Sequence, residues 1–180
     1  MKGFAAALAC LVFAGCGGSS PQPVAQTRPA PTPSGPHEDC STQSGADFSR
    51  AFTAPENLVV GPLVLIGGAY TPPAVVREFG GQKFPLLVMA GHRVTISVPR
   101  AIAGLAYGPL PQGETKLRDT HRKVTFVACD SAHAISSADG AAVTFWSGAV
   151  LTRRPACIPL EIAIDGGDPQ RVGLALGKRC

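Results

Sequence analysis

Three of the four histidines in this 180-residue chain are its main candidates for acid–base chemistry, together with nearby acids and a hydroxyl. A catalytic histidine needs a nucleophile or an orienting carboxylate within hydrogen-bond reach. The residues that could converge in this way are His92, His121, His133, Asp119, Asp130 and Ser131. The sequence contains no nucleophile elbow, two-histidine zinc helix or phosphate-binding glycine loop. It therefore assigns no catalytic residue, and a small envelope hydrolase or transferase whose site assembles only in space is the alternative function.

The first sixteen residues have the layout of an export signal that ends at a thiol. One early lysine precedes an apolar run of eleven residues, 4–14. Crossing a bilayer takes about 20 residues, so the run predicts a signal peptide and not a permanent span. Phe13, Ala14, Gly15 and Cys16 resemble the bacterial lipobox, in which an apolar residue, usually leucine, and two small residues precede an invariant cysteine. The resemblance implies cleavage before Cys16, a diacylglyceryl group on its thiol and frequent acylation of the new N-terminus.

This resemblance divides the chain into three segments. Residues 1–15 are the signal peptide, 16–39 a lipidated, proline-rich tether and 40–180 the folded domain. Prolines at 21, 23, 29, 31, 33 and 36 separate small polar residues, which favours an extended tether without a core. The expected partner is membrane lipid, reached through Cys16, on the extracytoplasmic side of the cell membrane. The alternative is an ordinary secretory signal that leaves Cys16 unmodified.

Four cysteines remain in the folded domain once Cys10 and Cys16 are set aside. No pair among Cys40, Cys129, Cys157 and Cys180 has the two-to-four-residue spacing of a zinc site, so no metal and no cofactor is predicted. An even number in an exported protein indicates two disulfides. We favour Cys129 with Cys157, both at strand ends, and Cys40 with Cys180, which would join the domain's two termini. The alternative pairs Cys40 with Cys129 and Cys157 with Cys180, since the latter two lie nearly opposite in the last hairpin.

The formal net charge of +4 is far below the dense basic footprint of a nucleic-acid binder, so no nucleic-acid partner is expected. One group of basic residues could instead form a positive face toward an anionic envelope polymer or lipid head groups. Its members are Lys116, Arg118, Arg122, Lys123, Arg153 and Arg154. A strand starting at Lys123 could run antiparallel to one ending near Arg153, which would place both at one end of the domain. The alternative is that solvated charges simply collect there.

Short strands punctuated by glycine and proline must position all of these residues. Residues 84–90 are continuously apolar, as in a strand buried on both faces, whereas residues 93–98 alternate as in a half-buried strand. Residues 158–164 and 172–176 predict a hairpin, and residues 58–66 an edge strand broken at Gly61 and Pro62. Residues 71–73 and 130–142 are interpreted as connections, and Trp146 as a core residue.

About eight such strands predict an all-β fold, an antiparallel β-sandwich stapled by disulfides. No catalytic constellation is visible, and sandwich loops present binding residues well. The sequence therefore favours a binding or structural module of the cell envelope.

Overall fold

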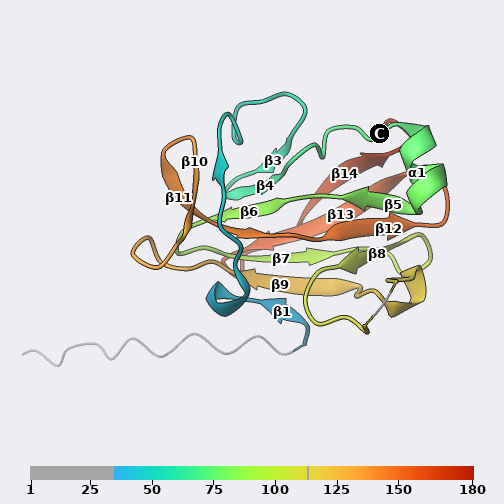
Figure 1. Cartoon of the computed structure of the whole chain (residues 1–180). Coiled ribbons are helices and arrows are strands. Elements are labelled where there is room, and N and C mark those ends of the chain that lie inside the picture. Colours follow the sequence, from blue (N-terminus) through green and yellow to red (C-terminus); the bar gives the residue numbers. More distant parts are fainter. Residues whose placement is uncertain (1–34, 113) are drawn as a thin grey trace, which may run out of the picture. The chain divides into compact units, whose positions relative to one another are not determined.

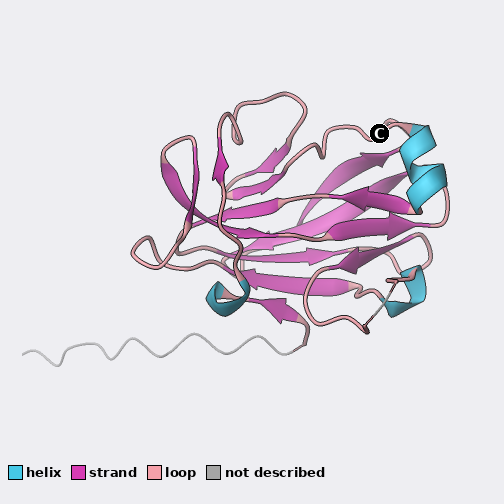
Figure 2. Cartoon of the chain, viewed as in Figure 1, coloured by secondary structure: helices cyan, strands magenta, loops and turns pink. Residues whose placement is uncertain are grey.

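The computed structural model describes residues 35–112 and 114–180 (Figure 1). The predicted signal peptide, the lipidation site Cys16 and most of the predicted tether lie outside these residues. The described part of the chain is an all-β fold with one short α-helix, as the sequence predicted. Figure 2 shows how strongly strands dominate it.

Fourteen strands within the described residues form three hydrogen-bonded sheets. The five-stranded sheet has the order β1 (His37–Glu38), β9 (Lys123–Val127), β7 (Arg93–Ser97), β13 (Ala156–Ile164), β14 (Gln170–Leu176). The six-stranded sheet has the order β2 (Asp47–Phe48), β10 (Ser136–Ala138), β11 (Ala141–Trp146), β6 (Leu86–Met89), β4 (Leu63–Leu65), β3 (Leu58–Val60). The three-stranded sheet has the order β5 (Gly81–Lys83), β12 (Ala149–Thr152), β8 (Ala103–Ala106). The helical segments are α1 (Pro73–Phe79) and the 3-10 turns η1 (Cys40–Thr42) and η2 (Leu117–Asp119).

The six-stranded and three-stranded sheets form one continuous layer, because β5 leads into β6 and β11 leads into β12. At this joint the Phe84 N–H donates to the Gly148 carbonyl at 2.9 Å, which continues the pairing from one sheet to the other. The main core lies between this layer and the five-stranded sheet, since one cluster of buried side chains draws on all three sheets. The protein is therefore a two-layered β-sandwich.

The predicted strand patterns are confirmed where a single face is buried. Val94 and Ile96 of β7 are buried, while Arg93, Thr95 and Ser97 are only half-buried. The last hairpin pairs Ile158 with Leu174 and Leu160 with Val172.

The strand β6 is buried on both faces, as the continuous apolar run predicted. Leu86 and Val88 face the main core, whereas Leu87 packs with Val64 and Val143 in a second cluster on the opposite face. Residues 48–52 cover that second cluster through Phe48, Ala51 and Phe52.

Trp146 is a core residue, only 1% exposed. Its Nε1–H points toward the Asp39 carbonyl and the Thr42 hydroxyl at 3.1 and 3.2 Å. The indole therefore supports the turn η1, which carries Cys40.

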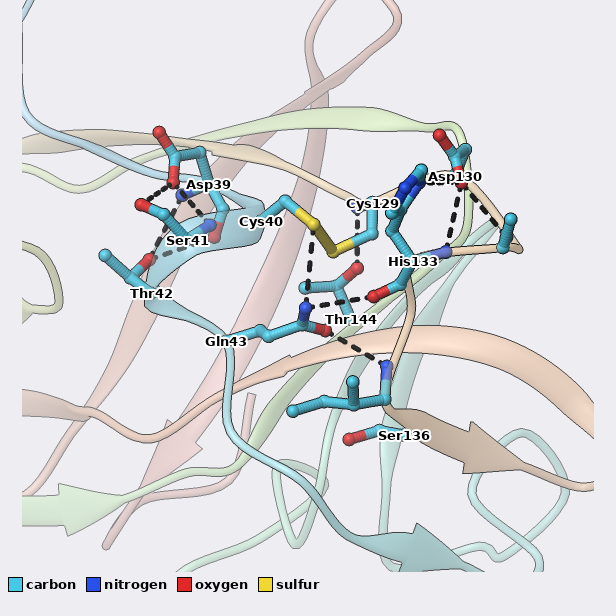
Figure 3. Close-up of a disulfide and its surroundings, with 12 residues drawn as sticks. Asp39, Cys40, Ser41, Thr42, Gln43, Cys129, Asp130, His133, Ser136 and Thr144 are labelled. Carbon is cyan, nitrogen blue, oxygen red and sulfur yellow. Dashed lines mark hydrogen bonds and ion pairs between the residues drawn. A yellow bond between two sulfur atoms is a disulfide. The ribbon is translucent and has the colours of Figure 1, made fainter.

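The favoured disulfide pairing is wrong, and the structure has the alternative: Cys40 with Cys129 and Cys157 with Cys180. β1 lies beside β9, which brings η1 to the end of β9 where Cys129 follows (Figure 3). At the other site the chain turns back at Gly177, in the left-handed region with φ 75°, so Cys180 returns over β14. Gly173 leaves room for it, since a Cβ there would lie 2.6 Å from the Cys180 sulfur.

Four local features differ from the sequence prediction. Gly61 and Pro62 form a hairpin turn, so the predicted edge strand is two strands. Of these two, β3 lies at the edge of its sheet and β4 is wholly buried. The predicted connection at residues 71–73 runs into α1, which has proline at its first position and Gly80 in the left-handed conformation at its end. The 130–142 connection contains β10. Two short pairings, β1 with β9 and β2 with β10, are parallel, and β1 lies within the segment predicted as tether.

Candidate anion-binding site

Basic side chains surround a hollow of about 180 Å³ near the start of β8. Three of the six predicted basic residues line it, namely Arg118, Arg122 and Arg153. Arg100, which the sequence analysis did not select, lines it as well, together with His121. We call this depression the arginine hollow, after Arg100, Arg118, Arg122 and Arg153.

β8 brings these side chains together from both of its edges. On one edge Leu105 and His121 exchange backbone hydrogen bonds of 2.8 and 2.9 Å, which places Arg122 next to the strand. On the other edge Thr152 of β12 pairs with Ala103, so Arg153 follows at the same end. β9 and β12 do not pair with each other as the sequence suggested. Instead β8 pairs with β12 on one edge and with His121, just before β9, on the other.

Gly104 seats the turn η2 against β8. A Cβ at Gly104 would overlap the Thr120 hydroxyl and lie 2.7 Å from the Thr120 Cβ, so only glycine permits this approach. The Thr120 hydroxyl donates to the Leu117 carbonyl at 2.6 Å, which closes the turn. Arg118 sits within this turn, and its position therefore depends on the absent side chain at residue 104.

The arginine hollow carries positive charge without a matching carboxylate in its lining. Arg118 contacts its neighbour Asp119 at 3.6 Å. Within residues 35–112 and 114–180, no carboxylate forms an ion pair with Arg100, Arg122 or Arg153. All four arginine side chains are exposed. Such an arrangement can receive an anion, because guanidinium groups bond carboxylate and phosphate oxygens in pairs.

A second groove, of about 660 Å³, adjoins the hollow and shares Arg122 with it. Its walls are mainly apolar and include Val98, Pro99 and Pro159. Three charged side chains also line it: Lys123, Glu161 and Arg171. Arg171 donates to Glu161 from Nη2 at 2.9 Å and from Nε at 3.1 Å. The groove is therefore also net positive, because Glu161 is its one carboxylate against Arg122, Lys123 and Arg171. The remaining predicted residues, Lys116 and Arg154, are exposed but line neither depression.

Two of the candidate histidines pair with an aspartate, at separate places, and His37 also lies 3.8 Å from Asp39. His133 Nδ1 lies 2.8 Å from Asp130 Oδ1 within one exposed turn beside the Cys40–Cys129 disulfide (Figure 3). His92 Nδ1 lies 2.8 Å from Asp165 Oδ2. The hydrogen bond from His133 is the main cause of a lowered pKa at Asp130. For Asp165, the Arg93 N–H lowers the pKa most, followed by His92.

Neither pair has the contacts of a nucleophile–base site. In the described part of the chain, no serine, threonine or cysteine side chain hydrogen-bonds either imidazole. His121 instead places Nε2 2.8 Å from the Pro109 carbonyl. Of the residues that the sequence offered for catalysis, His133 and Asp130 are thus brought together, but no nucleophile within the described residues joins them.

A third depression, of about 740 Å³, lies beside α1 and the three-stranded sheet. Val75, Phe79, Leu110 and Leu151 contribute to its lining, and no histidine or aspartate does. Across the residues that the structure describes, no three His, Cys, Asp or Glu side chains are grouped as a metal site would require. The described helices include none that is both long and apolar enough to span a bilayer.

Comparisons of this chain with protein-family models, with curated proteins and with solved structures found no match.

Proposed function

We propose that this chain is an exported, lipid-anchored module of the cell envelope that binds an anionic envelope surface through the arginine hollow. The observation that carries the proposal is the convergence of Arg100, Arg118, Arg122 and Arg153 on one depression whose lining contains no carboxylate. Attachment and recognition are separate in this proposal, since the lipid on Cys16 holds the protein and the arginines select what it touches.

The anchor follows from the lipobox resemblance at residues 13–16. A single acyl chain binds a membrane only reversibly, whereas two or more chains hold a protein stably. A diacylated Cys16 would therefore supply attachment by itself. Each cation beside an anionic membrane adds about 1 kcal/mol, so the four arginines would contribute a few kcal/mol toward orientation.

The route by which the chain enters the fold supports this orientation. β1 runs parallel to β9, and the Pro36 carbonyl accepts a hydrogen bond of 3.2 Å from the Thr125 N–H. Lys123 begins β9, and Arg122, which lines the arginine hollow, precedes it. The last residues of the predicted tether thus join the fold at the end of β9 that carries these cations. An anchored protein would keep this end toward the surface that holds its lipid.

Vesicle binding tests the recognition part of the proposal. The full chain carrying Cys16→Ala should bind vesicles of phosphatidylglycerol and not vesicles of phosphatidylcholine, and more tightly at low salt than at physiological salt. The added double change Arg100→Gln/Arg153→Gln should abolish most of this binding. Arg77→Gln/Lys178→Gln removes the same charge from exposed positions that do not line the hollow and is the matched control. Equal losses in both variants would contradict a localised site.

Intact-mass analysis of membrane fractions tests the anchor. The unmutated chain should begin at Cys16 and carry the added mass of a diacylglyceryl group, and Cys16→Ala should remove that mass and release the protein. A mature chain with an unmodified Cys16 would refute this part.

A further inference from the structure

We infer that the arginine hollow takes one phosphoryl group of a phosphate ester and that the adjoining groove takes the polyol or sugar to which it is esterified. The inference rests on the proposed function, because it names the chemical class that the same site recognises. It goes beyond electrostatic contact with a charged surface, since it predicts a saturable site for one small group.

The size of the hollow limits what can enter it. Its volume of about 180 Å³ equals that of roughly six water molecules in the liquid, at about 30 Å³ each. Pockets for whole drug-sized ligands usually measure about 300–1,000 Å³, so the hollow fits a single small group. A tetrahedral oxyanion is such a group.

The donors around the hollow suit phosphate better than carboxylate. A guanidinium group is always charged and offers five N–H donors in a planar fork, which bonds phosphate oxygens in pairs. Arg100, Arg118, Arg122 and Arg153 approach from three separate segments of the chain, so their forks can reach different oxygens of one anion. A phosphoryl group presents three or four oxygens to them, whereas a carboxylate presents two.

The adjoining groove indicates what the phosphate is attached to. Its volume of about 660 Å³ lies within the range of small-molecule pockets, and Arg122 lines both spaces. Val98, Pro99 and Pro159 supply apolar wall surface. Glu161, held by Arg171, can accept hydrogen bonds from hydroxyl groups, and Lys123 can donate to hydroxyl oxygens. An organic part that carries hydroxyls therefore fits this groove.

Such an ester could reach the site as a lipid head group or as a separate molecule or polymer unit. The recognised chemistry is the same in both cases, namely a phosphate linked to a hydroxyl-bearing carbon chain. The experiment therefore uses a soluble ester and a membrane-bound one.

Isothermal titration calorimetry of the full chain in a non-ionic detergent tests the site with glycerol 1-phosphate, inorganic phosphate and acetate. We expect one glycerol 1-phosphate per chain, weaker binding of inorganic phosphate and little binding of acetate. Arg100→Gln and Arg153→Gln should each weaken glycerol 1-phosphate by about tenfold or more, because each removes a charged hydrogen-bond donor. Arg77→Gln should leave the affinity unchanged.

Glu161→Gln separates the two parts of the ligand. This variant should reduce the preference for glycerol 1-phosphate over inorganic phosphate while leaving the affinity for inorganic phosphate no weaker. A preference that is unchanged in Glu161→Gln would refute the role of the groove. The absence of saturable binding by either phosphate, or unaltered affinity in both arginine variants, would refute the site.

Competition distinguishes this inference from the proposed function. If glycerol 1-phosphate displaces the Cys16→Ala chain from phosphatidylglycerol vesicles, the site binds lipid head groups and both proposals hold. If the ester binds at the hollow but the chain ignores vesicles, the phosphate-ester site holds and the membrane-surface part of the proposed function fails. If vesicles bind in an arginine-dependent way that no soluble ester competes with, the proposed function holds and the phosphate-ester inference is wrong.

Discussion

Gly104→Ala should damage both the stability of the fold and the arginine hollow. The new methyl group would overlap the Thr120 hydroxyl and lie 2.7 Å from the Thr120 Cβ and 3.2 Å from Leu117 Cδ1. The Thr120 atoms are close to its backbone, so no rotamer change can relieve the overlap and η2 must move away from β8. Overpacking of this kind costs about 1–3 kcal/mol. For a domain of this size, about 2 kcal/mol corresponds to a fall of roughly 4–8 °C in the melting midpoint.

Thermal unfolding followed by circular dichroism measures the first effect, and glycerol 1-phosphate binding measures the second. Gly45→Ala is the matched control, because its Cβ would meet only ordinary contacts, the nearest being Ile135 Cδ1 at 3.6 Å. Adding Thr120→Gly to Gly104→Ala should recover part of the lost stability, since it removes the side chain that clashes. Equal stability of the two alanine variants would refute the described contact between η2 and β8. Intact binding in a destabilised Gly104→Ala would instead refute the claim that η2 positions the site.

Three further predictions concern the fold. Replacing both cysteines of the Cys40–Cys129 bridge by serine should lower the free energy of unfolding more than the same change at Cys157–Cys180, because the bridges close separations of 89 and 23 residues. The chain-entropy model gives stabilisations of about 4.6 kcal/mol for the first bridge and about 3.4 kcal/mol for the second. Denaturant titration of the two variants would show which loses more stability. Burial raises the pKa of Tyr107, so above about pH 10 the unfolded chain releases this proton while the folded one keeps it, and stability should fall as pH rises. The Tyr107 hydroxyl donates to the Phe84 carbonyl at 2.8 Å. Tyr107→Phe should flatten the fall in stability in alkaline melts, at a cost of about 1 kcal/mol for this lost hydrogen bond. The pKa of Asp165 is lowered in the folded state, so its contribution to stability is present above about pH 4 and is lost as pH falls. Asparagine tolerates the φ of 51° at this position. Asp165→Asn should therefore reduce the decline in melting midpoint between pH 5 and pH 2.

Local periodicity was enough to predict the strands whose burial is one-sided or complete. The alternation in β7 and the matched apolar faces of β13 and β14 gave the correct faces, because side chains in a strand alternate with a period of two. The helix α1 was missed since Pro72 and Pro73 suggested a turn. Proline is nevertheless compatible with the first position of a helix, where its missing N–H has no partner to lose.

Longer-range neighbours could not be predicted in the same way. The disulfide pairing depends on the void at Gly173 and on the left-handed turn at Gly177, and neither has a pattern that spacing alone reveals. Arg100 was missed for a related reason, since it lies in a loop without alternation. It reaches the hollow only because β8 places that loop beside η2 and the end of β12. The basic run was visible in the sequence, but the neighbours that β8 brings together were not.

The two disulfides also decide how the protein would respond to mechanical load. A pull applied between Gly35 and Cys180 can detach the two-residue strand β1, but it then reaches Cys40 and passes through sulfur directly into the end of β9. The second bridge similarly removes the last hairpin from the loaded path, because Cys157 and Cys180 are joined. Beyond residues 35–40, only the stretch from Cys129 to Cys157 could extend, to a span of roughly 100 Å at about 3.5 Å per residue. Under tension the rest of the described chain would behave as two covalently closed loops, and the segment holding Arg100, Arg118 and Arg122 lies inside one of them.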